Sequence, residues 1–171
     1  MLNQNAVYLL CGKFINMISV GQTAPDFSLF SSEKTKVSLQ EFKGKNVLLL
    51  FFPQAFTSVC TAELCSVRDN MQQYANLNVQ AIGISVDSVF TLAKFKEEQQ
   101  YNFPLLSDFN KEISGAYGSL YADWILDMKG VSKRSAFLID REGVIRYAEV
   151  LDNPGEQPNF QAIQEAISAL Q

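Results

Sequence analysis

The chain has 171 residues, of which 47% are hydrophobic, and a formal net charge of −4. A chain of this length and composition suffices for one globular domain with its own core. The excess of acidic residues argues against a nucleic-acid partner, and no run reaches the roughly 18 apolar residues that span a membrane.

The sequence contains no histidine and three cysteines. Without histidine, neither Ser-His-Asp nor Cys-His catalysis is available, and histidine-containing zinc sites are excluded as well. Three cysteines fall short of the number that an all-thiolate structural zinc site needs, so we predict neither a metal nor any other cofactor. They also do not make a disulfide framework. This cysteine usage suits a reducing compartment and predicts a cytoplasmic protein.

The first residues lack the features of a secretion signal. Val7 to Leu10 is apolar, but no basic segment precedes it, and Leu10 before Cys11 is not the small residue of a cleavage site. We predict that residues 1–16 form a poorly ordered tail and that residues 17–171 make up the folded domain. Met17 is a second candidate for the natural first residue.

The first half of the predicted domain alternates strands and helices. Val37–Phe42 is predicted as a short strand followed by one helical turn, and the apolar run Asn46–Phe52 is typical of a strand buried on both faces. The next helix begins at Thr57 or Ser58 and extends to Asn76. Its core face is predicted from apolar residues at helical spacing: Leu64, Val67, Met71, Tyr74 and Ala75.

The second half continues the alternation and ends with a hairpin and a helix. The remaining predicted elements are a strand at Val79–Val86, a helix capped by Asp87 and Ser88 that reaches Tyr101, an extended piece at Pro104–Leu106, a helix at Lys111–Tyr117, strands at Ser135–Asp140 and Val144–Val150, and a helix at Asn159–Leu170. Strand–helix–strand units require parallel neighbours, whereas the hairpin adds an antiparallel pair. This order predicts an α/β fold, a three-layer α/β/α sandwich around a central mixed β-sheet.

Cys60 stands at the start of the long predicted helix, shortly after the strand and loop that contain Pro53. A cysteine reacts as its thiolate, and the free N–H groups and the dipole at a helix N-terminus favour negative charge. Pro53 has no N–H and ends strand pairing, and Thr57 is close enough in sequence for its hydroxyl to bond the sulfur or a substrate. The alternative is a buried inert thiol, since Cys60 also falls on the apolar stripe of the helix.

Cys65 follows five residues later. On a continuous helix the two thiols are roughly 140° apart around the axis, and their Cα atoms are roughly 8 to 9 Å apart, which is beyond the range of a disulfide. A disulfide between them therefore requires the first turns of the helix to unwind. Cys65 shares its face with polar residues such as Arg68 and Gln72, so we predict that it is exposed, which favours a redox role over a structural one.

The spacing Pro53-x-x-x-Thr57-x-x-Cys60 resembles the active-site signature of the peroxiredoxins. The likeness extends over residues 18–171 and includes Gly21-x-x-Ala24-Pro25-Asp26-Phe27 and Arg134-Ser135-Ala136-Phe137-Leu138-Ile139-Asp140. The loop after Pro53 and the segment Asn153-Pro154-Gly155-Glu156 most resemble the E type of alkyl hydroperoxide reductase. The cysteine five residues after Cys60 resembles the Q type, also called bacterioferritin-comigratory protein.

The resemblance implies a thioredoxin-like fold and the reduction of hydrogen peroxide and organic hydroperoxides. Cys60 matches the peroxidatic cysteine of the family, and Pro53, Thr57 and Arg134 match its three partners. An arginine suits this role because its permanent charge and its N–H donors stabilise the charge that moves to the departing peroxide oxygen. The alternative for Arg134 is an ordinary surface cation beside Lys133.

Two further residues are expected to support this site. Backbone N–H groups near Val59 complete the cradle for the peroxide, and Glu63 matches a family position that often carries an acidic or amide side chain. The alternative for Glu63 is a first-turn acid that only complements the helix dipole.

The predicted cycle begins with oxidation of Cys60 to a sulfenic acid, which Cys65 resolves as an intramolecular disulfide for reduction by a thioredoxin-like partner. A one-cysteine peroxidase that uses an external low-molecular-weight thiol, and a thiol-based redox sensor or holdase, remain alternatives. A thiol–disulfide oxidoreductase on the same fold would want Cys-x-x-Cys instead. Family members often associate through a face beside the active site, so a homodimer is expected.

Overall fold

The computed structural model describes residues 8–10, 13–15 and 18–171. Two short strands, β1 (Tyr8–Leu10) and β2 (Lys13–Ile15), pair antiparallel ahead of the main domain. Both strands fall within the predicted tail of residues 1–16, whereas Cys11 and the other residues of that tail lie outside the described residues. No helix within the described ranges is long and apolar enough to cross a bilayer.

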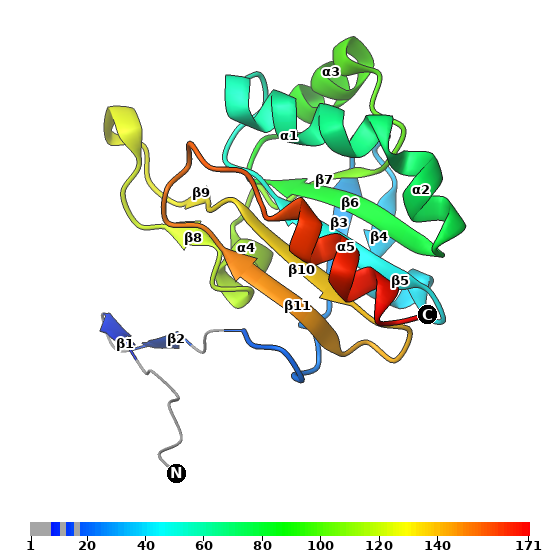
Figure 1. Cartoon of the computed structure of the whole chain (residues 1–171). Helices are drawn as coiled ribbons and strands as arrows, with labels where there is room; N and C mark the ends of the chain where they lie inside the picture. The colour runs from blue at the N-terminus through cyan, green and yellow to red at the C-terminus, as the bar shows by residue number, and fades with distance from the viewer. Residues whose placement is uncertain (1–7, 11–12, 16–17) are drawn as a thin grey trace.

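A seven-stranded mixed sheet forms the centre of the domain (Figure 1). Its order is β11-β10-β5-β6-β7-β3-β4. The strands are β3 (Ser28–Ser31), β4 (Lys36–Ser38), β5 (Asn46–Phe51), β6 (Val79–Ser85), β7 (Leu105–Ser107), β10 (Ser135–Ile139) and β11 (Ile145–Val150). β5, β6 and β7 are parallel, whereas β10 and β11 form an antiparallel hairpin beside β5. The predicted parallel strands and late hairpin are confirmed.

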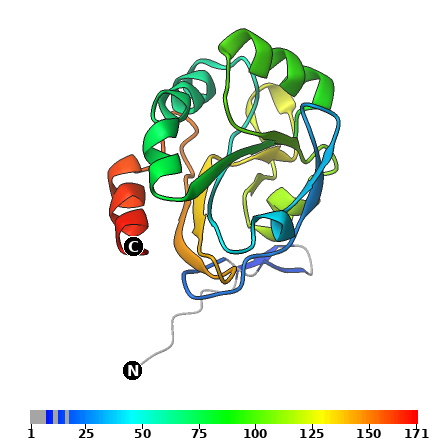
Figure 2. The ribbon, with the colours of Figure 1, turned by 90° about the vertical axis from the view of Figure 1, so that its right-hand side faces the viewer.

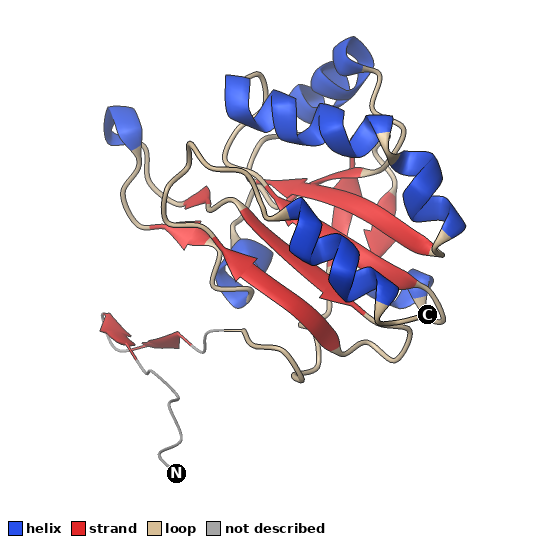
Figure 3. Ribbon diagram, in the orientation of Figure 1, coloured by secondary structure: helices blue, strands red, loops and turns tan. Residues whose placement is uncertain are grey.

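Helices cover both faces of this sheet, as Figure 2 shows edge-on. One face carries α1 (Ser58–Asp69), α2 (Met71–Asn76), α3 (Val89–Gln99) and α5 (Phe160–Ser168). The opposite face carries α4 (Glu112–Ala116) and the 3-10 turn η1 (Leu39–Phe42). The three-layer α/β/α sandwich with a mixed central sheet is therefore confirmed, and Figure 3 distinguishes its helices and strands by colour.

The side-chain alternation of β5 explains why its sequence is apolar throughout. Leu48 and Leu50 point into the core under α1, α3 and α5, whereas Val47 and Leu49 point into the core under α4 and η1. Successive side chains of a strand face opposite sides of the sheet, so a strand between two helical layers needs apolar residues at every position. Every residue of β5 is buried.

The structure differs from the sequence prediction in a few elements. The predicted helix from residue 57 to 76 is divided at Asn70, whose side-chain amide donates to the carbonyl of Ser66 at 2.8 Å and whose φ of −102° and ψ of 8° interrupt the ladder. The strand β3, which lies between β7 and the edge strand β4, was missed because only one of its four residues is buried. Two short strands, β8 (Leu120–Tyr121) and β9 (Val131–Ser132), and the turn η2 (Ile125–Asp127) between them were missed as well.

Candidate active site

The sheet topology brings Cys60, Glu63 and Arg134 together. Phe51 at the end of β5 pairs with Ser135 at the start of the antiparallel strand β10, so Arg134 lies at the end of the sheet where α1 begins. Nη2 of Arg134 donates to Sγ of Cys60 at 3.3 Å, and Nη1 forms an ion pair with Glu63. The guanidinium thus bridges a thiol and a carboxyl on one helix.

All three side chains are almost completely buried. Cys60 and Arg134 are each 1% exposed and Glu63 is 0% exposed. Nη2 of Arg134 also donates to the carbonyl of Pro154 at 3.0 Å. Arg134 is therefore not the surface cation of the alternative interpretation, and Glu63, which lies beyond the first turn of α1, is not a first-turn acid that only complements the helix dipole. Buried charges are costly unless partners compensate them, so this cluster depends on all of its contacts.

One cation in this cluster faces two acidic groups. Burial raises the pKa of the Glu63 carboxyl to about 7, although the charge and hydrogen bond of Arg134 oppose that rise. Among the described residues, Oε1 of Glu63 and Nε of Arg134 have no hydrogen-bond partner. Near neutral pH, a protonated Glu63 leaves the positive charge of Arg134 available to the sulfur of Cys60.

Replacing Glu63 by glutamine will flatten the pH dependence of stability. The folded-state pKa of about 7 lies above the ordinary value of 4.5, so folding favours the protonated carboxyl. The stabilising contribution is complete below about pH 4.5 and is lost as the pH rises through 7, which amounts to on the order of 3 kcal/mol. Urea unfolding of the wild type and of Glu63→Gln at pH 5 and pH 8 measures this loss. We expect it in the wild type and not in the variant.

The matched control is Glu142→Gln, which changes an exposed carboxyl in the β10–β11 turn. It is expected to leave the wild-type pH dependence in place. A Glu63→Gln protein whose stability falls between pH 5 and pH 8 as steeply as that of the wild type contradicts the raised pKa of the buried carboxyl.

Asp87, which was predicted from the sequence only as a helix cap, holds the loop between β5 and α1. Oδ2 of Asp87 accepts a hydrogen bond from the backbone N–H of Ala55 at 2.8 Å and another from the hydroxyl of Ser85. Ser88 alone caps α3, through the N–H of Thr91. The sequence signal that could have indicated this role was the position of Asp87. It follows β6, the parallel neighbour of β5, at the edge where the sites of α/β sheets form.

Pro53 and Phe56 shape the same loop. Pro53 is buried directly after Phe52, where β5 ends. Phe56 has a φ of +64°, in the left-handed region that non-glycine residues rarely adopt, and its ring packs 4.9 Å from that of Phe95 on α3. Such strained residues persist where the surrounding structure holds them, often at functional sites.

Thr57 is the N-cap residue of α1, as predicted, and its hydroxyl bonds the backbone of the preceding loop. The exposed Oγ1 donates to the carbonyl of Gln54 at 2.9 Å. The first helical hydrogen bond begins at the N–H of Thr61, which bonds the carbonyl of Thr57. Within the described part of the chain, the N–H groups of Val59 and Cys60 therefore have no hydrogen-bond acceptor, and they are available as donors at the helix start.

Cys65 lies on another face of α1, apart from the cluster around Arg134. Its prediction as an exposed residue was wrong: Cys65 is half-buried and packs against the core, because the end of α3 covers this face of α1. Its sulfur lies 3.8 Å from Oε1 of Gln99 and 4.0 Å from the hydroxyl of Tyr101. Both cysteines are free thiols on one unbroken helix.

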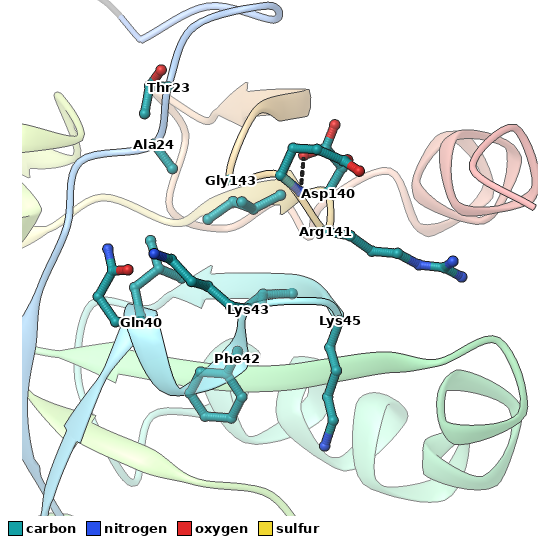
Figure 4. Close-up of a pocket in the computed structure, with 13 residues that line it drawn as sticks. Thr23, Ala24, Gln40, Phe42, Lys43, Lys45, Asp140, Arg141 and Gly143 are labelled. Carbon is teal, nitrogen blue, oxygen red and sulfur yellow. Dashed lines mark hydrogen bonds between the residues drawn. The ribbon is translucent and has the colours of Figure 1, made fainter.

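A separate hollow of about 440 Å³ lies at the other end of the sheet, beside the start of β5. It is lined by residues 39–47 and 139–143 among others, and by none of the predicted site residues. Figure 4 shows the cationic side chains of Lys43, Lys45 and Arg141 pointing in three different directions. Their charges do not converge, so this hollow offers no anion site.

Comparison with known proteins connects the site to a family. A family model described as the AhpC/TSA family matches residues 20–148. Alkyl hydroperoxide reductase E of Mycobacterium tuberculosis is 39% identical over 157 residues, which cover 90% of this chain and 99% of that protein. This chain is a peroxiredoxin of the AhpC/TSA family. A chloroplastic 2-Cys peroxiredoxin of Spinacia oleracea is 36% identical to this peroxiredoxin over 163 residues, covering 89% of this chain and 59% of that protein.

Solved peroxiredoxin structures share the fold. Peroxidoxin BcpB from Mycobacterium tuberculosis superposes with a TM-score of 0.75 and 29% identity, covering 88% of this chain and 95% of that one. The reduced 2-Cys peroxiredoxin of Plasmodium vivax gives a TM-score of 0.78 and 32% identity over 89% of this chain and 81% of that one. The thioredoxin-like fold is confirmed, and so is the predicted enzyme class: a peroxiredoxin reduces hydroperoxides at the expense of a thiol reductant.

Proposed function

We propose that Cys60 is the thiol that reduces the hydroperoxide and that Arg134 is its cationic partner. The observation that carries this proposal is the contact of 3.3 Å between Nη2 of Arg134 and Sγ of Cys60 in a buried site. A fixed positive charge at this distance stabilises a thiolate much more strongly in a desolvated site than in water. No histidine is available to act as the base.

The proposed reaction transfers one oxygen atom to sulfur. The Cys60 thiolate bonds the terminal oxygen of the hydroperoxide, the O–O bond breaks, and its electron pair leaves on the other oxygen, which is protonated to an alcohol or to water. Arg134 and the free N–H groups of Val59 and Cys60 stabilise the charge that builds on the two oxygens. Pro53 and Thr57 shape the loop that holds these donors; Thr57 supports it by its bond to Gln54.

Cys65 is proposed to resolve the sulfenic acid of Cys60 as an intramolecular disulfide, which a thioredoxin-like partner then reduces. The support is proximity along α1, because five residues separate the two thiols on one helix. The cycle requires a reducing environment, and with the small number of cysteines this favours the cytoplasm.

Stopped-flow fluorescence of the reduced protein with hydrogen peroxide tests the assignment. The single tryptophan, Trp124, is a suitable reporter because its ring packs against that of Tyr121, with the ring centroids 4.5 Å apart. The hydroxyl of Tyr121 in turn donates to the carbonyl of Asp152, near Arg134. We expect a first phase at least about a hundredfold faster than the reaction of a free thiol. With Cys65→Ser, a sulfenic acid trapped at Cys60 is expected in place of a disulfide.

Two outcomes contradict parts of this proposal separately. A first phase no faster than the oxidation of free cysteine would mean that Cys60 is not an activated thiol. A fast first phase that leaves a stable sulfenic acid in the wild type removes Cys65 from the cycle and supports the one-cysteine mechanism with an external low-molecular-weight thiol.

We extend the proposal to a homodimer. The aromatic residues Tyr117, Tyr121 and Trp124 do not form one exposed surface, because Tyr117 is buried in the core and the other two are half-buried. A group of exposed phenylalanines at the rim of a hollow of about 500 Å³ supports a contact surface better: Phe30, Phe90 and Phe109. Sedimentation velocity of the wild type and of Phe90→Glu tests this; a wild type that stays monomeric at high concentration contradicts it.

A further inference from the structure

The half-buried Cys65 packs against the core and also contacts two polar groups that the peroxidatic step does not use. Its thiol donates to Oε1 of Gln99, the last residue of α3, at 3.8 Å and to the hydroxyl of Tyr101, two residues further on, at 4.0 Å. Figures 1 and 2 show α3 lying beside α1. These two polar contacts distinguish Cys65 from a cysteine that only fills space in an apolar core.

Tyr101 presents its hydroxyl from a fixed position. The residue is 4% exposed, and its ring packs 5.1 Å from Phe95 and 5.6 Å from Phe103. Burial raises the pKa of Tyr101, and the charge of the Cys65 thiolate raises it further. The phenol therefore keeps its proton and offers it as a hydrogen bond to a sulfur that carries negative charge.

Arg68 adds a positive charge on the same side of α1. It lies three residues after Cys65, which puts both on one helix face. Its Nη1 donates to the carbonyl of Gln99 at 2.6 Å, and its Nε pairs with Asp69. The hydrogen bond to Asp69 and the charge of Cys65 raise the pKa of Arg68. The guanidinium thus bonds the end of α3, and its positive charge acts on the sulfur of Cys65.

The two halves of α1 are held unequally. Leu64 and Val67 in the second half are completely buried, and Asn102 donates to the carbonyl of Arg68 at 3.3 Å. At the other end, Thr57 and Ser58 are exposed. A disulfide requires part of the helix to unwind, and the exposed first residues have fewer contacts to lose than the buried second half. We therefore expect the start of α1 to unwind as far as Cys60, which gives up its contact with Arg134, while Cys65 stays against α3.

We propose that Tyr101, supported by Arg68 and Gln99, positions and activates Cys65 for attack on oxidised Cys60. This inference rests on the proposed roles of the two cysteines. In the step, the Cys65 sulfur bonds the Cys60 sulfur, the S–O bond of the sulfenic acid breaks, and the thiol proton of Cys65 joins the departing hydroxide to form water. The Tyr101 hydroxyl donates to the Cys65 sulfur while that sulfur carries the charge.

Tyr101→Phe tests the role, because it removes the hydroxyl and keeps the ring among Phe95 and Phe103. After a pulse of hydrogen peroxide, the rate of disulfide formation divided by the rate of Cys60 oxidation is expected to fall five- to tenfold, and sulfinic acid at Cys60 to increase in proportion. The matched control is Tyr74→Phe, which removes the hydroxyl of another buried tyrosine in the same core. It is expected to keep the wild-type ratio.

A second measurement is independent of peroxide chemistry. In the Cys60→Ser background, the rate at which iodoacetamide alkylates Cys65 is expected to fall about fivefold on adding Tyr101→Phe, because the thiolate loses a donor. If Tyr101→Phe forms the disulfide and alkylates as fast as its parent or faster, the hydroxyl does not activate Cys65 and the inference is overturned. A wild type that oxidises quickly at Cys60 yet forms no disulfide overturns it too, and leaves the peroxidase assignment standing.

Discussion

Replacing Cys60 by serine will lower the second-order rate constant for peroxide reduction by at least about a thousandfold. Serine is close to cysteine in size and keeps the start of α1 in place. Its hydroxyl, however, is not ionised near neutral pH, and Arg134 at 3.3 Å then has no thiolate to stabilise. Competition for hydrogen peroxide with a second peroxidase of known rate measures the loss.

The matched control for this variant is Cys11→Ser, because Cys11 lies outside the segment that matches the family. It is expected to retain the wild-type rate constant. If the Cys60→Ser protein still consumes peroxide at a rate near that of the wild type and Cys65 carries the oxidation, then Cys65 and not Cys60 is the peroxidatic thiol.

The sequence was sufficient to predict the central elements of the fold because local pattern and burial agree there. The apolar run at 46–52 predicted β5, which is buried on both faces. The predicted cap at Ser88 and the predicted helix start at Asn159 correctly located the starts of α3 and α5, where both side chains accept a backbone hydrogen bond. The strand β3 and the two-residue strands β8 and β9 were missed because their pairing depends on neighbours rather than on periodicity.

The candidate site was predictable in its residues but not in its contacts. The signature spacing singled out Pro53, Thr57 and Cys60, and the family resemblance added Arg134. No local signal indicated that Glu63 would be buried against that arginine, because the partners are 71 positions apart in the chain. The burial of Cys65 was missed for the same reason: the end of α3 covers it, and helix periodicity describes only one helix at a time.

Arg134→Met will reduce the rate constant for peroxide reduction about a hundredfold, which is the usual cost of removing one donor that stabilises a developing oxyanion. Methionine fills much of the same volume but carries no charge. The variant loses the contact to Cys60, the ion pair with Glu63 and the hydrogen bond to the carbonyl of Pro154. Stopped-flow oxidation of Cys60 measures the first of these losses directly.

The same variant tests how Glu63 responds when its partner is removed. In the wild type, Arg134 opposes the rise in the pKa of the Glu63 carboxyl. In the variant, burial alone therefore raises that pKa above 7. The destabilisation by Arg134→Met is therefore expected to be greater at pH 8, where the carboxyl resists protonation, than at pH 6. Urea unfolding at the two pH values measures the difference, and Glu63→Gln added to Arg134→Met is expected to remove it.

Arg134→Lys separates the charge of the arginine from its geometry. Lysine keeps a positive charge but has a single ammonium group, which cannot contact Cys60, Glu63 and the backbone of Pro154 in the forked arrangement of a guanidinium. We expect a rate between those of Arg134→Met and the wild type. If the lysine variant is as slow as the methionine variant, the simultaneous contacts of Arg134 with Cys60 and Glu63 matter more than its charge. If the methionine variant keeps the wild-type rate, Arg134 has no role in the peroxidatic step.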